Sequence, residues 1–245
     1  MSIEILKNYV HGQFTTMAHG STFDVLNPAT GSRIYSVQQA DTALMESAID
    51  SAREGFSTWA KMPPVERARI LQQAARLLRE RNDALAEIEV LDTGKPWQEA
   101  VAVDVQTGAD VIEDFANLCP SLMGEQQSVG EDFFYTRQEP LGVCLGIGAW
   151  NYPLQIACWK AGAALAAGNS MIFKPSEETP RGAAMLAEIF TEAGVPAGVF
   201  NVVQGDAEVG KYLVQHPAIA KVSLTGEVET GKRVMASAAT SLKQV

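Results

Sequence analysis

The fold is decided by residues 141–153, which read LGVCLGIGAWNYP. The first seven of these residues are almost entirely apolar, which is typical of a strand buried on both faces of a sheet. The glycines at 146 and 148 can form a turn, and Pro153 can occupy the first turn of a following helix. A buried strand, a glycine turn and a helix in succession predict the first unit of an alternating β/α domain.

The same succession repeats along the rest of the chain. We predict strands at residues 142–147, 170–173, 199–203 and 221–224, separated by helices at 153–167, 180–193 and 206–215, with another helix after Glu227. Apolar strands that alternate with helices indicate an α/β fold with a doubly wound parallel sheet. In such sheets ligands bind beyond the carboxyl ends of the strands, so we searched those ends for chemistry.

Upstream of this region the pattern is different. Short β-like runs with Gly and Asn-Pro between residues 9 and 37 predict hairpins. Helical spacing follows, with Asp41 as an N-cap and Pro64 in the first turn of a second helix. The apolar positions of these two helices are Leu44, Ala48, Ile49, Ala52, Phe56 and Trp59 in the first, and Ile70, Leu71, Ala74, Leu77 and Leu78 in the second.

Two further helices and a hairpin complete this part. We expect a third helix from residue 82 to 92, ending near Gly94, and a fourth from 97 to 118, closed by Pro120. Residues 121–140 read as a β-hairpin, which is too isolated to be stable alone and should pack on something else.

Composition excludes several classes of function. The chain has 245 residues and a net charge of −10, which argues against binding to nucleic acid or an anionic membrane. The apolar stretches are too short to cross a bilayer, and the first residues lack the order of a secretion signal. The three cysteines lie in apolar segments, as buried reduced thiols of a cytoplasmic protein do, and no Cys/His spacing suits zinc.

Three predicted strand ends carry polar or glycine-bearing motifs. Residues 146–151 begin like a dinucleotide fingerprint, but Asn151 replaces the third glycine, and a simple strand-to-helix turn would also need these glycines. Residues 173–177, Phe-Lys-Pro-Ser-Glu, offer a cation and an acceptor to a ribose, or form a solvated loop. Residues 225–231 form a glycine-bearing turn whose N–H groups could face a pyrophosphate.

In this order and spacing the three motifs resemble the aldehyde dehydrogenase family. Residues 27–31, Asn-Pro-Ala-Thr-Gly, and 91–95, Leu-Asp-Thr-Gly-Lys, are also similar to family patterns, so the resemblance covers essentially the whole chain. It implies the N-terminal half of an NAD- or NADP-dependent aldehyde dehydrogenase, with a Rossmann-like cofactor domain. Family members are about twice as long, and their general-base Glu and nucleophilic Cys lie beyond residue 245.

The resemblance implies roles for individual residues. Asn151 matches the amide that hydrogen-bonds the oxyanion formed when the aldehyde is attacked. Lys160 matches a position of a charge relay, although a packed Lys with a structural partner is an alternative. Glu227 departs from the family, where Ser is common, so either its carboxylate points away from the pyrophosphate or the phosphate contacts shift. The residues implied to bind the cofactor are Gly148, Ala149, Trp150, Lys174, Pro175, Ser176, Glu177, Gly226, Val228 and Gly231.

Within the family the chain is most similar to the bacterial betaine aldehyde branch, including residues 108–111 and 220–223. In that branch Tyr152 and Trp159 match aromatic residues around the trimethylammonium group of the substrate, although both could be core residues or serve another aldehyde. The branch also binds potassium. Its ligands match the carbonyls of Val25 and Leu26 and the carboxylate of Asp92, which could instead act at the helix end.

The resemblance further implies three regions and a homo-oligomer, a dimer or tetramer. Residues 1–120 hold the N-terminal hairpins and helices of the cofactor domain, 121–140 the oligomerisation hairpin, and 141–245 the dinucleotide-binding α/β portion. Two hypotheses follow. Either the chain is part of an enzyme that oxidises betaine aldehyde to glycine betaine, and is inactive alone, or it is a non-catalytic dinucleotide-binding or assembly module.

Overall fold

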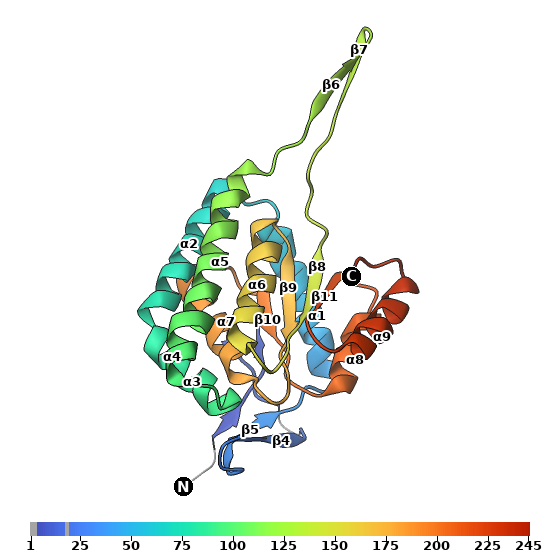
Figure 1. Ribbon diagram of the computed structural model, residues 1–245. Coiled ribbons are helices and arrows are strands. Elements are labelled where there is room, and N and C mark those ends of the chain that lie inside the picture. The colour runs from blue at the N-terminus through green and yellow to red at the C-terminus, as the bar shows by residue number, and fades with distance from the viewer. Residues whose placement is uncertain (1–3, 18–19) are drawn as a thin grey trace.

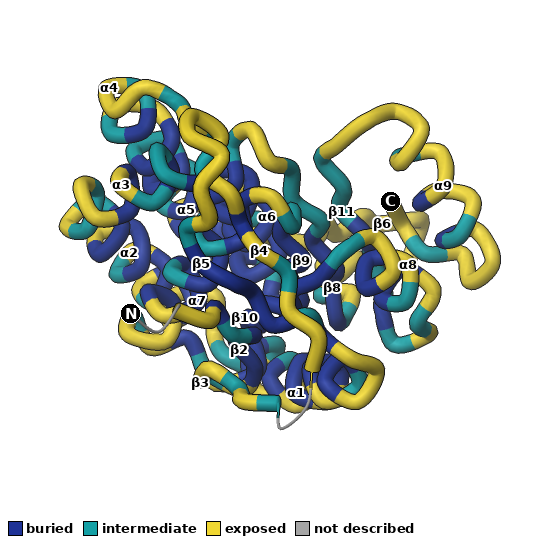
Figure 2. The backbone as a smooth tube through the Cα atoms, turned by 90° about the horizontal axis from the view of Figure 1, so that it is seen from below, coloured by how far each residue is buried: buried dark blue, intermediate teal, exposed yellow. Residues whose placement is uncertain are grey.

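A six-stranded sheet forms the centre of the molecule. The computed structural model describes residues 4–17 and 20–245. The strands of the sheet are arranged in the order β11-β8-β9-β10-β2-β3, in which β2 (Tyr9–Val10) and β3 (Gln13–Phe14) come last. Figure 1 labels the other four strands. Its parallel part consists of β8 (Val143–Ile147), β9 (Ser170–Lys174), β10 (Phe200–Val202) and β11 (Ile219–Leu224). Because these four strands pair in parallel, the predicted parallel α/β sheet is confirmed. Every residue of β9 and β10 is buried, as expected for strands covered on both faces (Figure 2).

The helices predicted between these strands are also present. They are α6 (Pro153–Ala166), α7 (Arg181–Ala193), α8 (Ala207–Gln215) and α9 (Val228–Ala239). Helix α8 begins where the Asp206 carboxylate accepts a hydrogen bond from the N–H of Glu208 at 3.0 Å. Helix α7 ends at Gly194, whose φ of 101° is accessible to glycine at little cost.

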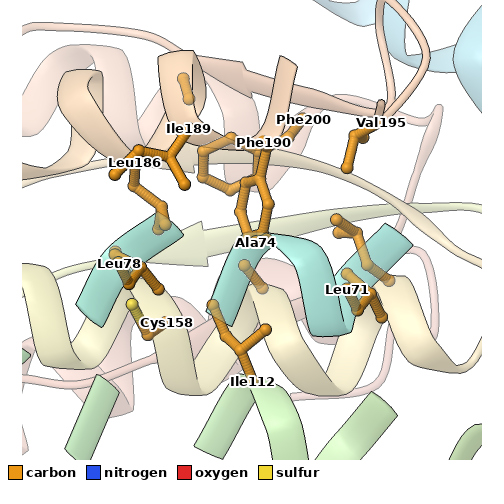
Figure 3. Packing of buried hydrophobic residues seen from close by; sticks show 14 of the residues in the cluster. Leu71, Ala74, Leu78, Ile112, Cys158, Leu186, Ile189, Phe190, Val195 and Phe200 are labelled. Atoms are coloured by element: carbon orange, nitrogen blue, oxygen red, sulfur yellow. The ribbon is translucent and has the colours of Figure 1, made fainter. Parts of the chain in front are cut away.

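Alternating residues of the strands belong to two separate cores. Met171 and Phe173 of β9 face a core built with α2 (Pro64–Glu80), α5 (Gln106–Leu118), α6 and α7. Ile172, between them, faces a second core with α1 (Thr42–Trp59) and α8. Figure 3 shows the first core, where leucines of α2 meet Ile112 of α5 and Phe190 of α7. Because the sheet is covered on both faces, its exposed functional surface lies at the strand ends.

The N-terminal helices follow the predicted signals closely. Helix α1 (Thr42–Trp59) is capped by the Asp41 carboxylate, which accepts a hydrogen bond from the N–H of Leu44 at 2.8 Å. Helix α2 (Pro64–Glu80) begins at Pro64, as expected. Helix α3 (Asn82–Thr93) ends at Gly94 in the left-handed conformation, with φ of 72°.

The fourth predicted helix is not uniform, so that expectation was wrong in part. It consists of a short α4 (Trp97–Glu99), a π-helical segment η1 (Ala100–Val105) and α5 (Gln106–Leu118), followed by a 3₁₀ turn η2 (Cys119–Ser121). A π turn inserts an extra residue into a helix and is frequent near functional sites. Here it directs Asp104 into the interior, where the residue is fully buried.

The N-terminal strands divide between two sheets. The β2 (Tyr9–Val10) and β3 (Gln13–Phe14) hairpin joins the central sheet, with β2 antiparallel to β10. The other strands, β1 (Ile5–Leu6), β4 (Thr22–Leu26) and β5 (Arg33–Gln38), form a separate sheet in the order β1-β5-β4. Hairpins were predicted here, but their attachment to the central sheet was not.

A long hairpin, β6 (Gln126–Val129) and β7 (Asp132–Tyr135), extends from the body of the protein (Figure 1). The predicted hairpin is confirmed. All eight of its strand residues are exposed, so the packing partner that we expected for it is not found among residues 4–17 and 20–245. Across the described residues, no helix combines the length and the hydropathy needed to cross a membrane.

Candidate functional site

A cleft of about 850 Å³ lies beyond the carboxyl ends of β8, β9 and β11. The three strand-end motifs singled out in the sequence all contribute to it. The predicted residues that line it are Gly148, Ala149, Trp150, Asn151, Lys174, Ser176, Glu177 and Gly226. Pro175, Val228 and Gly231, which were predicted with them, are not among its lining residues.

The turn after β8 is shaped by close packing. The N–H of Gly148 donates to the carbonyl of Lys174 at 2.9 Å, which joins the ends of β8 and β9. A Cβ at Gly148 would lie 2.8 Å from the Phe173 ring, so a side chain there would force the ring to move. Trp150 and Asn151 follow as exposed residues at the entrance of the cleft.

The end of β9 presents a fixed carboxylate. The Lys174 ammonium, which is buried, lies 3.0 Å from a carboxylate oxygen of the half-exposed Glu177. A buried cation restricts the position of the Glu177 carboxylate beside the cleft. A carboxylate held in this way is a suitable acceptor for the hydroxyl groups of a sugar.

The hydrogen bonds of Glu227 distinguish between the two alternatives raised by the sequence, a side chain that points away from the pyrophosphate and a shift of the phosphate contacts. Its carboxylate accepts hydrogen bonds from the N–H groups of Glu229 at 3.0 Å and Thr230 at 3.2 Å, and so caps α9. These are N–H groups that the sequence assigned to a pyrophosphate. A carboxylate already occupies them, so of our two alternatives the geometry favours a shift of the phosphate contacts away from this helix end.

Sequence reasoning missed the polar residues that α8 and α9 add to the cleft. They are Glu208, Lys211 and Gln215 from α8, and Thr230, Arg233 and Ser237 from α9. Their spacings of three and four residues place each set on one helical face. That spacing could have been recognised once both helices had been assigned beside a strand end.

Lys160 and Trp159 line a second cavity, of about 420 Å³, which Asn151 does not line. The Lys160 ammonium is buried, as predicted, and donates to the hydroxyl of Ser223 at 3.0 Å. Burial lowers the pKa of Lys160 to about 8, so part of its population is neutral near physiological pH. The structure therefore divides the two predicted catalytic residues between two cavities.

Tyr152 lies immediately before α6, in surroundings that differ from those of Trp159. Its hydroxyl donates to the carboxylate of Glu99 at 2.9 Å. The Lys95 ammonium lies 4.0 Å from the centroid of its ring. Because a cation already contacts the ring, Tyr152 has a structural role in addition to the substrate contact predicted for it.

Asp92, predicted to bind potassium, is held by protein groups. Both of its carboxylate oxygens lie 2.8 Å from the hydroxyl of Tyr35, and burial raises the pKa of Asp92 to about 6. Val25 and Leu26 belong to β4, which pairs with the strand that carries Tyr35. Residues 4–17 and 20–245 contain no cluster of three His, Cys, Asp or Glu side chains suited to a metal ion. Potassium binding therefore stays a prediction.

The cysteines do not contribute to the cleft. Cys119, Cys144 and Cys158 are free and buried, as predicted. Burial raises the pKa of Cys144 to about 11, which keeps this thiol protonated and unreactive. None of the three is among the residues that line the cleft beside Asn151.

The doubly wound sheet and the cleft at its carboxyl edge define the class: an α/β protein with a site large enough for a nucleotide cofactor. The chain belongs to the aldehyde dehydrogenase family, whose family model matches residues 14–245.

Curated relatives include two proteins named betaine aldehyde dehydrogenase, from Vibrio vulnificus strains YJ016 and CMCP6. Each is 60% identical to this chain over 244 residues, which are 99% of this chain and 50% of the relative. The chain thus spans about half the length of these relatives.

Solved structures of the same family superpose closely. An NAD+ complex of an aldehyde dehydrogenase from Bacillus cereus has a TM-score of 0.96 at 37% identity, covering 99% of this chain and 50% of that one. An indole-3-acetaldehyde dehydrogenase in complex with NAD+ has a TM-score of 0.95 at 36% identity, covering 100% and 50%.

Proposed function

We propose that this chain supplies the cofactor-binding half of an enzyme that oxidises betaine aldehyde to glycine betaine with NAD. The observation that carries the proposal is the cleft in which Asn151 lies at one strand end and the Lys174–Glu177 pair at the next. Asn151 would donate its side-chain N–H to the oxygen that becomes negative when the aldehyde is attacked. The attacking thiolate and the general base would come from outside this chain, as the family resemblance implies.

The residues of the cleft fit a nicotinamide dinucleotide, whose chemistry is to accept a hydride. Glu177 would accept hydrogen bonds from the adenosine ribose, with Lys174 holding its carboxylate in place. Gly148 would allow close approach of the cofactor, because it carries no side chain. The extra phosphate of NADP would meet the Glu177 carboxylate, so the proposal favours NAD over NADP.

Glu177→Gln should weaken NAD binding by about fivefold, because a neutral amide is a poorer acceptor than a carboxylate. NADP affinity should fall less, since the substitution also removes a negative charge that faces its phosphate. Calorimetric titration of both cofactors into the chain measures the two affinities. Glu178→Gln is the matched control, because Glu178 is exposed and is not a lining residue. Unchanged NAD affinity in Glu177→Gln would remove the residue from the ribose site.

The choice of aldehyde rests on two supports. The curated relatives at 60% identity bear the name of betaine aldehyde dehydrogenase. Trp159, which lines the second cavity, and Tyr152, whose ring also contacts the Lys95 ammonium, provide aromatic rings. A quaternary ammonium, which cannot donate hydrogen bonds, is bound best by such faces. The relative that acts on indole-3-acetaldehyde, at 36% identity, defines the alternative, an aldehyde of another class.

Trp159→Ala should lower kcat/KM for betaine aldehyde by about tenfold, a value between those of an exposed and a desolvated cation–π contact. An uncharged aldehyde of similar size should lose much less. Steady-state kinetics on an active protein that contains this chain compares the two substrates. Trp97→Ala is the control, because Trp97 and Trp159 are both 43% exposed. Equal losses of kcat/KM for both aldehydes in Trp159→Ala would show that Trp159 does not contact the trimethylammonium group of the substrate.

Three finer features belong to the same proposal. The exposed aromatic residues of β7 would form a surface for self-association in a homo-oligomer. The carbonyls of Val25 and Leu26 with Asp92 would hold potassium, and Lys160 would relay protons through the second cavity. The alternative function is that of a module that binds the cofactor without turnover. It would use the same cleft, and it differs from the proposed function only in lacking the catalytic groups that the proposal places outside this chain.

A further inference from the structure

The main chain at Asn151 is held by a side chain from a distant part of the sequence. The ammonium of Lys95, just after α3, donates to the carbonyl oxygen of Asn151 at 2.9 Å. The same ammonium lies 4.0 Å from the ring centroid of Tyr152. Nearby, Glu99 of α4 accepts a hydrogen bond from the Tyr152 hydroxyl. The connection between α3 and α4 thus contacts two consecutive residues of the turn at the cleft.

The position of Lys95 is itself restricted. Its side chain is 9% exposed and forms an ion pair with Asp104, which is fully buried. Asp104 reaches the ammonium from the π-helical segment η1, the local irregularity that the sequence did not reveal. A cation held by a buried carboxylate has little freedom to move, so its remaining N–H directions are fixed as well.

A second acid, Glu89, lies close to Asp104 in the interior. Glu89 of α3 is buried, and neither of its carboxylate oxygens has a hydrogen-bond partner among the described residues. Burial, together with the nearby Asp104 carboxylate, raises the pKa of Glu89 well above its ordinary value. Glu89 therefore favours its neutral form more than an exposed carboxyl group does.

The turn that Lys95 contacts has few other restraints. Trp150 and Asn151 are exposed, and residues 148–151 belong to no helix or strand. At its start the turn is held by the bond from the N–H of Gly148 to the carbonyl of Lys174. At its end the carbonyl of Tyr152 accepts from the N–H of Ile156 in the first turn of α6. Lys95 adds the restraint at Asn151, between these two ends.

We propose that Lys95, held by Asp104, is a positioning residue that fixes the main chain of Asn151 and so presents its side-chain amide to the cleft. The proposal rests on the function proposed above, in which that amide stabilises an oxyanion. An oxyanion donor is effective only when it is already oriented before the reaction. Lys95 acts through Asn151 and makes no contact with the substrate in this scheme.

Hydrogen exchange of the chain tests the positioning directly. Lys95→Met should speed exchange at the amides of Gly148 and Ile156 by about fivefold to tenfold. These amides donate hydrogen bonds at the two ends of the turn, which opens more easily without the bond from Lys95. Arg67→Met is the matched control: Arg67 is also a buried cation that donates to main-chain carbonyls, those of Met62 and Ala166, on other elements. This control should leave exchange at both amides unchanged. Unchanged exchange in Lys95→Met would overturn the proposal.

A second variant covers the case in which Lys95→Met leaves Asp104 without a partner and unfolds the chain. The double variant Lys95→Met/Asp104→Asn removes both charges at once, so the Asp104 carboxylate is not left in the interior without its cation. It should fold and show the same faster exchange at the amides of Gly148 and Ile156. Lys95→Arg, which keeps a donor and a charge, should restore part of the protection. A folded double variant with normal protection would also overturn the proposal.

Kinetics separates this inference from the function on which it rests. In an active protein that contains this chain, the double variant should lower kcat by about tenfold and change the KM for NAD by less than about twofold. In an Asn151→Ala background it should cause little further loss of kcat, because the group that it positions is absent. An equal loss in both backgrounds would overturn the inference. If Asn151→Ala alone left kcat unchanged, the proposed function would fail, while the exchange result would still decide the positioning.

Discussion

Asn151→Ala lowers kcat by about a hundredfold or more in an active protein that contains this chain, on the precedent of deleting one oxyanion donor. The loss is expected in kcat because the negative oxygen exists only after the aldehyde is attacked. The N–H donor therefore stabilises the transition state more than the bound substrate. Steady-state kinetics, with single-turnover measurement of NADH formation, gives the size of the effect and shows whether the chemical step carries it.

Two further variants make this result specific. Asn151→Asp keeps the shape of the side chain but replaces the N–H donor by an acceptor, so it should be at least as slow as Asn151→Ala. Asn117→Ala removes an exposed amide that bonds to Gln72 on the helical layer and should have no effect. A turnover within about twofold of the wild type for Asn151→Ala contradicts the role of oxyanion donor.

Trp59→Ala destabilises the chain by about 3–5 kcal/mol, the range for deleting a large buried aromatic side chain. Trp59 is fully buried at the end of α1, and its indole N–H donates to the carbonyl of Leu165 in α6 at 2.8 Å. The substitution leaves a cavity and removes one of two donors to the Leu165 carbonyl, which also accepts from the N–H of Gly168 at 2.9 Å. Urea unfolding followed by circular dichroism measures the free energy of unfolding.

Two other substitutions show how much of the loss of stability in Trp59→Ala comes from the hydrogen bond and how much from the burial of the side chain. Trp59→Phe retains most of the apolar volume and loses the hydrogen bond, so it should cost about 1–3 kcal/mol. Trp97→Ala truncates a tryptophan that is 43% exposed and should change stability by less than about 1 kcal/mol. Similar losses for Trp59→Ala and Trp97→Ala would show that burial at the end of α1 contributes little.

Most of the local structure could be predicted from sequence because its signals are local. The Asp41 cap, the start of α2 at Pro64 and the end of α3 at Gly94 lie where the residue types place them. The four parallel strands were recognised by their apolar runs, since burial on both faces excludes polar residues. The same reasoning directed attention to the strand ends, where the structure does place a cleft.

Gly55, inside α1, is a residue whose role cannot be predicted from local sequence signals. Helix propensity alone treats Gly55 as a weak point that Ala would improve. In the structure a Cβ there would lie 2.4 Å from the main chain of Gly198 and Val199. The helix approaches the segment before β10 too closely for any side chain, and nothing in the sequence near Gly55 indicates that approach.

The pattern of residues along the chain was sufficient for the order of strands and helices and for the polar groups at the strand ends. Periodicity and capping depend on neighbours a few residues apart, and these are visible in any sequence. Tertiary structure alone decided that Glu227 caps α9, that Lys160 and Asn151 line different cavities, and that Lys95 reaches the carbonyl of Asn151. These contacts depend on rotamers, on a π turn and on the packing of distant elements, which local pattern does not record.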